Sequence, residues 1–133
     1  MRFKNIFVVD DDMVYHFIVK KLFSKCNVSA KTSYFFNGLD AIENLKERIE
    51  NQDDEDQIPD LILLDINMPV YDGWQFLEEY QKLKSKFNKE IIVYLISSSN
   101  DSTDINKSKM FGAEVKNYYY KPISVEDFQE IFI

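Results

Sequence analysis

The chain has 133 residues, the size of one ordinary domain, and its 45% hydrophobic and 29% charged residues are typical of a globular fold. Its net charge of -7 argues against direct binding to nucleic-acid phosphates or to anionic lipid, because there is no basic excess to neutralise them. Cys26 is the single cysteine, which excludes an internal disulfide and a multi-cysteine zinc site. The sequence has no signal-peptide pattern and no apolar run near the roughly 20 residues that span a bilayer, so we expect a cytoplasmic protein.

The first half of the chain alternates strand-like and helix-like segments. Residues 6–9 form a β-rich apolar run typical of a strand covered on both faces. Asp12 is a plausible N-cap for a helix in which apolar residues then recur at helical spacing: Val14, Phe17, Ile18 and Leu22. Residues 30–36 predict a second strand, Asn37 and Gly38 a turn. A second helix follows, with an apolar stripe made of Ala41, Ile42, Leu45 and Ile49.

The second half repeats this alternation after an acidic segment at 50–57, which we interpret as a solvated loop. The remaining strands are expected at 61–64, 91–96 and 115–119. Asp72 is the expected cap of a third helix, whose stripe contains Trp74, Leu77, Tyr80 and Leu83. A short fourth helix is expected to end near Gly112, and residues 124–127 have the form of a capping box that opens a last helix.

Five strand–helix units in succession predict an α/β fold with a parallel sheet and helices on both faces. Ligands of such sheets bind at the carboxyl ends of the strands. Asp10, Asp11 and Asp12 follow the first strand, and Asp65 follows the third. Ser97 and Lys121 follow the fourth and fifth, so these residues are expected to meet at one edge of the sheet.

Carboxylates gathered at one edge repel, by about 4 kcal/mol for two unit charges 4 Å apart at an effective dielectric near 20. A bound cation relieves this repulsion, and oxygen ligands without histidine or cysteine favour Mg²⁺. A lysine and a hydroxyl opposite the metal indicate phosphoryl chemistry, with Asp65 as the best-placed nucleophile. Taken singly, each residue also has a structural explanation: Asp12 caps a helix, and a lone lysine such as Lys121 is usually a surface residue. The functional interpretation depends on all of them meeting at one edge.

Four blocks in this order resemble the receiver domains of two-component response regulators. They are residues 6–12, residues 61–73, which include Asp65 and Pro69, the strand ending at Ser97 and Ser98, and Tyr120-Lys121-Pro122. The resemblance covers nearly the whole chain and implies a flavodoxin-like, doubly wound (βα)5 fold with strand order 2-1-3-4-5. It also implies that residues 1–133 form a single receiver domain with no output domain in this chain.

The resemblance implies a role for each matching residue. Asp65 is expected to be the phosphoacceptor, with Asp10, Asp11, Asp65 and the backbone carbonyl of Asn67 around Mg²⁺. Ser97 and Lys121 would contact the phosphoryl group, and the bond between Lys121 and Pro122 would be cis, which is rare for X-Pro bonds. Tyr118 resembles the aromatic switch that responds when Ser97 moves. We further expect Asn67, Ser98 and Ser99 to set the lifetime of the phosphoryl group.

The expected function is a phosphorylation switch rather than an enzyme with a separate substrate, although such a domain catalyses its own phosphorylation and dephosphorylation. A sensor histidine kinase or a histidine phosphotransfer protein would be the donor, and an unknown protein the downstream target. The output surface would combine the fourth helix, the fifth strand and the fifth helix. Two alternatives stay open: a pseudo-receiver that binds partners without phosphorylation, and a Mg²⁺-dependent phosphatase or phosphotransferase on a similar sheet.

Overall fold

The computed structural model describes residues 3–51, 55–98 and 101–132. Its centre is a five-stranded parallel sheet in the order β2-β1-β3-β4-β5, which confirms the expected topology. The strands are β1 (Asn5–Val9), β2 (Lys31–Phe35), β3 (Leu61–Leu64), β4 (Ile92–Ser97) and β5 (Val115–Tyr120). Their bounds differ from the expected ones by at most one residue at either end.

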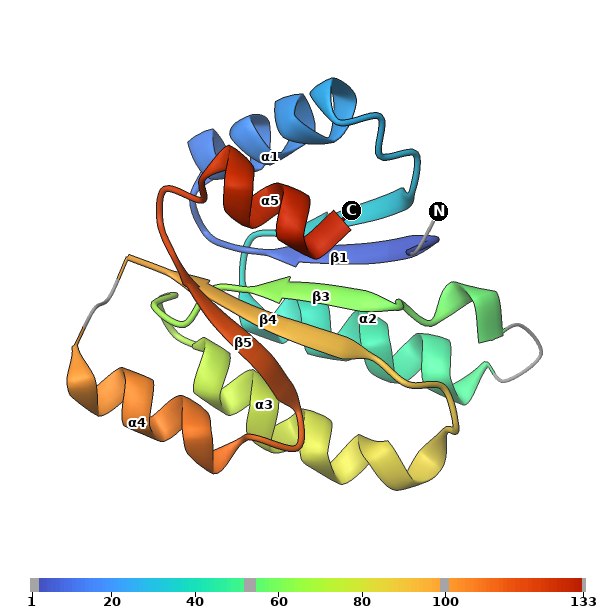
Figure 1. Cartoon of the computed structure of the whole chain (residues 1–133). Coiled ribbons are helices and arrows are strands. Elements are labelled where there is room, and N and C mark those ends of the chain that lie inside the picture. The colour runs from blue at the N-terminus through green and yellow to red at the C-terminus, as the bar shows by residue number, and fades with distance from the viewer. Residues whose placement is uncertain (1–2, 52–54, 99–100, 133) are drawn as a thin grey trace.

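Helices cover both faces of this sheet, as Figure 1 shows. One face carries α1 (Met13–Lys25) and α5 (Val125–Phe132); the other carries α2 (Gly38–Glu50), α3 (Gly73–Leu83) and α4 (Ser102–Met110). Short 3-10 turns lie at Glu55–Gln57, within the acidic segment, and at Lys84–Lys86. None of the helices in the described ranges combines the length and hydropathy that crossing a membrane requires.

The sheet divides the apolar interior into two layers, because successive strand residues point to opposite faces. Phe7 and Leu64 pack towards α2 and α3, where the expected stripes of both helices are buried. Val8 and Leu63 pack towards α1 and α5. All residues of β1 and β3 are buried, which explains their continuous apolar sequence.

Helix α1 turns a different face to the sheet than its apolar periodicity indicated. Val14, Phe17 and Ile18, expected as its apolar stripe, are respectively 65%, 57% and 40% exposed. The buried residues are Tyr15, His16, Val19 and Phe23. The helix therefore carries two apolar stripes. The stripe of buried residues faces the sheet, and in this orientation polar groups of the first turn contact the residues after β1.

Helix starts follow the expected capping chemistry. Asp12 accepts hydrogen bonds from the N–H groups of the first turn of α1, and Asp72 forms a complete capping box with Gln75. Ser124 accepts a hydrogen bond from the N–H of Asp127, at 3.0 Å, just before α5. Sequence reasoning did not assign Asn37 and Asp101 as N-caps; they cap α2 and α4.

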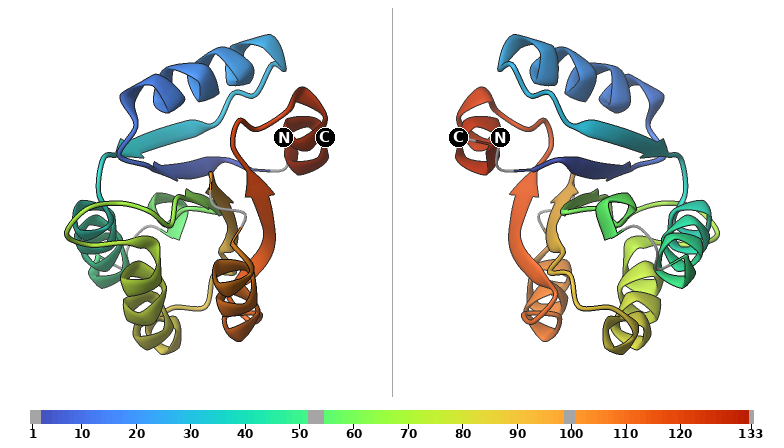
Figure 2. Two further views of the ribbon diagram at one scale, coloured as in Figure 1. Left: turned by 90° about the vertical axis from the view of Figure 1, so that its left-hand side faces the viewer. Right: turned by 90° about the vertical axis from the view of Figure 1, so that its right-hand side faces the viewer.

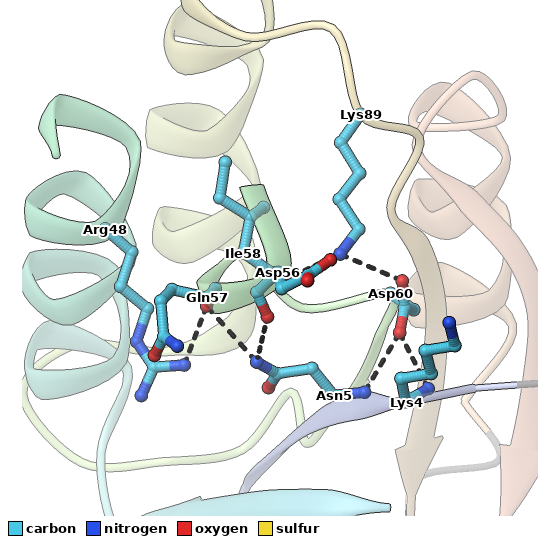
Figure 3. A network of polar contacts seen from close by, with 8 residues as sticks. All are labelled: Lys4, Asn5, Arg48, Asp56, Gln57, Ile58, Asp60 and Lys89. Atoms are coloured by element: carbon cyan, nitrogen blue, oxygen red, sulfur yellow. Dashed lines mark hydrogen bonds and ion pairs between the residues drawn. The ribbon is translucent and has the colours of Figure 1, made fainter. Parts of the chain in front are cut away.

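A polar network closes the amino ends of the strands (Figure 3). Asp60 accepts hydrogen bonds from the backbone N–H groups of Lys4 and Asn5, at 2.8 and 2.9 Å, and pairs with Lys89 at 3.0 Å. Lys89 also donates to the carbonyl of Ile58 at 2.6 Å. Burial alone would raise the pKa of Asp60, but these hydrogen bonds and the Lys89 charge outweigh it and lower the pKa. The network therefore joins β1 to the segments that precede β3 and β4.

Candidate functional site: an acidic pocket at the carboxyl ends of the strands

The four strand ends that the sequence singled out meet at one edge of the sheet, which faces the viewer in the left panel of Figure 2. Asp10 follows β1, Asp65 follows β3, Ser97 ends β4 and Lys121 follows β5. Hydrogen bonds between neighbouring strands fix these ends, since the N–H of Asp65 donates to Val9 and the N–H of Lys121 donates to Ser97, each at 2.9 Å. The parallel register therefore places groups that are distant in sequence side by side.

Three carboxylates form the centre of the pocket. Asp10, Asp11 and Asp65 each offer an oxygen atom, and all three oxygen atoms lie within 4.8 Å of one another. Asp10 and Asp65 are buried, with 1% and 4% of their surface exposed, whereas Asp11 is exposed. Asp12 points its backbone N–H at Asp10 Oδ1, at 2.8 Å, which fixes the Asp10 carboxylate. The pocket thus has two buried acids and one acid at its mouth.

Lys121 supplies the cation of the pocket. Its Nζ lies 2.5 Å from Asp10 Oδ2 and 3.6 Å from Asp65 Oδ2. Burial would lower the pKa of Lys121, but its hydrogen bond to Asp10 and the charges of Asp65 and Asp10 outweigh burial and raise it. The peptide bond between Lys121 and Pro122 is cis. Lys121 is therefore held as an ammonium group between two carboxylates, closer to Asp10.

One ammonium does not balance the acids. Burial and the neighbouring Asp10 charge raise the pKa of Asp65 to about 6, although Lys121 and a backbone hydrogen bond from Asn67 act in the opposite direction. Burial likewise raises the pKa of Asp10, against the hydrogen bond from Lys121. A cation bound among the oxygens would favour the ionised carboxylates, so the electrostatics of the pocket suit a divalent metal.

The described polar residues around the acids, Ser97, Asn67 and Ser98, lie where the sequence placed them. Ser97 is fully buried, and the side-chain amide of Asn67 lies 3.4 Å from its Oγ. Asn67 and Ser98 are exposed beside the pocket. Ser99, the third residue expected to set the phosphoryl lifetime, lies outside the described residues. Asn67 and Ser98 thus border the site from the solvent side.

Tyr118 lies on β5 opposite Leu95 and is half-buried against the apolar layer on the α2–α4 side. Its ring is 5.4 Å from that of Tyr120, centre to centre.

On the same side of the sheet, the Trp74 ring at the start of α3 stacks on Phe111, which follows α4, at 5.8 Å. Aromatic contacts therefore connect the helix that begins beside Asp65 with α4.

Gly73 is a site residue that sequence reasoning missed. A Cβ atom there would lie 2.5 Å from the Asp65 carbonyl oxygen and 2.9 Å from Ile66 Cα, distances that real Cβ atoms essentially never show. Its N–H donates to the Ile66 carbonyl at 3.0 Å. Glycine therefore lets α3 begin against the backbone of the central acid. The sequence signals were a glycine directly after a capping aspartate and its place at the end of the 61–73 block.

Two consecutive residues of α1 were missed as well. Tyr15 and His16 are buried, with 6% and 3% of their surface exposed. His16 Nε2 lies 2.6 Å from the Asp10 carbonyl oxygen, and the Tyr15 ring centre lies 4.7 Å from Lys121 Nζ. Each member of the Asp10–Lys121 ion pair thus has a partner on the first turns of α1.

Known proteins share this architecture. The sequence model of the response regulator receiver domain matches residues 6–132. The chain is 29% identical over 121 residues to the sensor histidine kinase CheAY of Helicobacter pylori, covering 91% of this chain and 13% of that protein. It is 28% identical over 127 residues to the two-component response regulator EHD1 of Oryza sativa subsp. indica, covering 96% of this chain and 33% of that protein. The chain therefore spans a third or less of the length of these two relatives.

Solved structures agree with the fold. A two-component response regulator from Cytophaga hutchinsonii superposes with a TM-score of 0.83 at 23% identity, covering 99% of this chain and 96% of that one. The Mn²⁺-bound form of response regulator Rcp1 superposes with a TM-score of 0.75 at 25% identity, covering 96% and 88%. The first likeness bears on the fold alone, and the second concerns a relative that holds a divalent metal.

Proposed function

The chain belongs to the response regulator receiver domain family, and we propose on this basis that it is a two-component phosphorylation switch whose phosphoacceptor is Asp65. One observation carries the proposal: Asp65 is a buried carboxylate with its pKa raised to about 6, and it faces Lys121 at 3.6 Å. Asp10, the other buried acid among the described residues, differs in that it pairs with Lys121 more closely, at 2.5 Å, and accepts the N–H of Asp12. The pocket thus suits a reaction in which the charge on Asp65 changes.

The proposed reaction is transfer of one phosphoryl group. A carboxylate oxygen of Asp65 attacks the phosphorus atom, the bond from phosphorus to the donor breaks, and the donor leaves with that electron pair. When a histidine side chain is the donor, the broken bond is P–N and the product is an acyl phosphate on Asp65. Lys121 and Ser97 then face the new oxygens, where an ammonium and a hydroxyl can donate hydrogen bonds.

Mg²⁺ fits the residues of this pocket. The oxygens of Asp10, Asp11 and Asp65 converge within 4.8 Å, and burial, with a contribution from the neighbouring carboxylates, keeps the pKa values of the two buried acids raised. We propose that these three side chains hold the ion together with the backbone carbonyl of Asn67. When bound, Mg²⁺ would supply positive charge to the phosphoryl oxygens. The Mn²⁺-bound relative Rcp1 supports a divalent metal in this family.

The phosphodonor is proposed to be a sensor histidine kinase or a histidine phosphotransfer protein. It must bring its phosphorylated side chain to the open side of Asp65. Exposed apolar side chains lie on the first turns of α1, among them Met13, Val14 and Phe17 at 72%, 65% and 57% exposure. Because α1 begins three residues after Asp10, this face offers apolar area for the donor close to the acceptor.

The proposed output is a population shift on the face made by α4, β5 and α5. Phosphorylation adds about -1.5 to -2 charges beside Ser97. Movement of Ser97 towards the phosphoryl group would leave space on the side of Tyr118, one strand away. A beryllofluoride mimic of the phosphoryl group should therefore shift amide resonances at Tyr118 and along residues 104–111. Shifts confined to the pocket would place the output elsewhere.

The lifetime of the acyl phosphate is proposed to depend on Asn67, Ser98 and Ser99. Asn67 and Ser98 are exposed beside the pocket, on the side from which water would approach. Charged or bulky replacements at Asn67 should change the rate of dephosphorylation while the Mg²⁺ midpoint stays the same. Unchanged rates for replacements at all three positions would contradict this assignment.

Intact mass after incubation with acetyl phosphate and Mg²⁺ tests the main proposal. Wild type should gain the mass of one phosphoryl group, which hydroxylamine should remove as expected for an acyl phosphate, and Asp65→Asn should gain none. Asp12→Asn is the matched control, because asparagine also caps helices and Asp12 lies outside the metal cluster. Equal labelling of wild type and Asp65→Asn would refute Asp65 as the acceptor. No labelling of wild type by any donor would favour the pseudo-receiver.

A further inference from the structure

We infer that Tyr15 is a positioning residue for Lys121, acting through the face of its aromatic ring. This inference rests on the proposed function, in which Lys121 faces the phosphoryl group. The Lys121 Nζ atom lies 4.7 Å from the Tyr15 ring centre, within the roughly 6 Å over which an ammonium is attracted to an aromatic face. The ring therefore contacts the charged atom that the reaction requires, not merely the side chain's hydrocarbon stem.

The ring is held rigidly. Tyr15 is 6% exposed and belongs to the apolar layer between the sheet and helices α1 and α5, which also contains Val19 and Ile123. The Lys121 side chain is 16% exposed, so little water screens the contact. Cation–π attraction is strongest at such desolvated sites. A fixed ring beneath a largely buried ammonium is thus able to define where that ammonium lies.

The ring also leaves the donors of Lys121 available. An ammonium has three N–H groups, and an aromatic face attracts the charge without being a conventional hydrogen-bond acceptor. Asp10 and Asp65 lie at 2.5 and 3.6 Å, so the N–H groups can serve both carboxylates and later a phosphoryl oxygen. Burial and the charges of Asp10 and Asp65 raise the pKa of Tyr15, so the phenol stays neutral. Tyr15 therefore positions the cation without adding a competing anion.

The hydroxyl of Tyr15 has no part in this role. Within the described residues it is buried and makes no hydrogen bond. Phenylalanine should therefore replace Tyr15 without loss, whereas leucine keeps the apolar surroundings but removes the aromatic face. Phe23 offers the matched control, because it is buried on the same helix in the same apolar layer, and its recorded ring contacts are with other aromatic rings.

The test combines a rate with a spectroscopic signal that needs no phosphorylation. We expect Tyr15→Phe to be phosphorylated by acetyl phosphate at the wild-type rate and Tyr15→Leu roughly 3- to 30-fold more slowly, with an unchanged Mg²⁺ midpoint. Phe23→Leu should lose stability but keep the rate. In the free protein, the ammonium resonance of Lys121 should be preserved in Tyr15→Phe and shifted or broadened in Tyr15→Leu.

A second set of variants carries phenylalanine analogues with one to several ring fluorines at position 15. Fluorine weakens the negative ring face while nearly keeping the shape of the ring, so these variants test the inference even where Tyr15→Leu fails to fold. The rate and the Lys121 resonance should change progressively with fluorination. A flat series, or a Tyr15→Phe variant as slow as Tyr15→Leu, would overturn the inference. If wild type itself accepts no phosphoryl group, the proposed function fails, and the Lys121 resonance alone still tests the role of Tyr15.

Discussion

Replacing Asp65 by asparagine should stabilise the metal-free protein at neutral pH. Burial and the Asp10 charge raise the pKa of Asp65 from 3.8 to about 6, so ionising this group costs free energy in the folded state. A tenfold change in the acid dissociation constant is worth about 1.4 kcal/mol. The shift therefore lowers the free energy of unfolding by at most about 3 kcal/mol at pH values above 6. Asparagine keeps the shape and cannot ionise, so Asp65→Asn should be about 1–3 kcal/mol more stable than wild type at pH 8.

The sign of the pH dependence follows from proton binding. Between pH 4 and 6 the folded state holds a proton on Asp65 that the unfolded state has released, so wild-type stability should fall as pH rises through this window. The advantage of Asp65→Asn should therefore be absent near pH 4 and fully present at pH 8. Asp10, whose pKa is also raised, adds a decrease of the same sign to both proteins.

Urea unfolding at pH 4, 6 and 8 without divalent metal measures this effect, which corresponds to about 3–4 °C in Tm for each kcal/mol in a chain of this size. Glu43→Gln, on the exposed face of α2, removes the same charge at a residue that does not contribute to the pKa shifts of Asp65 and Asp10, and controls for overall charge. Equal stability of Asp65→Asn and wild type at pH 8, or an advantage that does not depend on pH, would refute the electrostatic reasoning.

Three further results are expected. Millimolar Mg²⁺ should raise the Tm of wild type, by an amount equivalent to about 2.7 kcal/mol at a hundred times Kd, and Asp11→Asn should largely abolish the rise; a wild type that ignores Mg²⁺ would contradict the metal assignment. Gly73→Ala should cost more than about 1 kcal/mol in urea unfolding and impair phosphorylation, because the new methyl would meet the Asp65 carbonyl, whereas Gly112→Ala, whose nearest contact is 3.2 Å, should be milder. Asp60→Asn should destabilise the protein at pH 7 by about 1–3 kcal/mol and by less near pH 3, because the lowered pKa of Asp60 gives stability that is present above its unfolded value and lost as pH falls through the folded one; a pH-independent loss would contradict the ionic role of Asp60.

The sequence was sufficient to predict where the pocket lies. Parallel strands joined by helices place their carboxyl ends at one edge, so Asp10, Asp65, Ser97 and Lys121 could be brought together by topology alone. Apolar runs located the strands, and capping residues such as Asp12 and Asp72 located helix starts. These features depend on short segments and on one general rule of chain connection, so a single sequence contains them.

The environment of the pocket depended on longer-range packing, which periodicity does not encode. Helix α1 has two apolar stripes, and the spacing of Val14, Phe17 and Ile18 gave no means of seeing that Tyr15 and His16 face the sheet. Their partners, Lys121 and the Asp10 carbonyl, come from other elements. The close approach behind Gly73 also involves a backbone atom of another element. Such contacts follow from how elements are rotated against one another, and that rotation is a property of the whole core.

The two ends of the sheet use the same residue types to opposite effect. At the amino end, Asp60 and Lys89 pair at 3.0 Å, and two backbone N–H groups complete the carboxylate, so its pKa is lowered. At the carboxyl end, Lys121 pairs with Asp10 at 2.5 Å, and burial and the Asp10 charge raise the pKa of the neighbouring Asp65 more than Lys121 lowers it. An aspartate whose charge is already compensated, as in Asp60, gains less from a further cation. Asp65 gains from a bound cation, because the cation reduces the uncompensated negative charge of a buried pocket, and a phosphoryl group, which adds negative charge there, depends on that cation and on Lys121. The electrostatic cost of the acids at this edge therefore favours binding of a metal ion, which in turn offsets the charge of a phosphoryl group, and the ion-paired network at the other edge contributes to the stability of the fold.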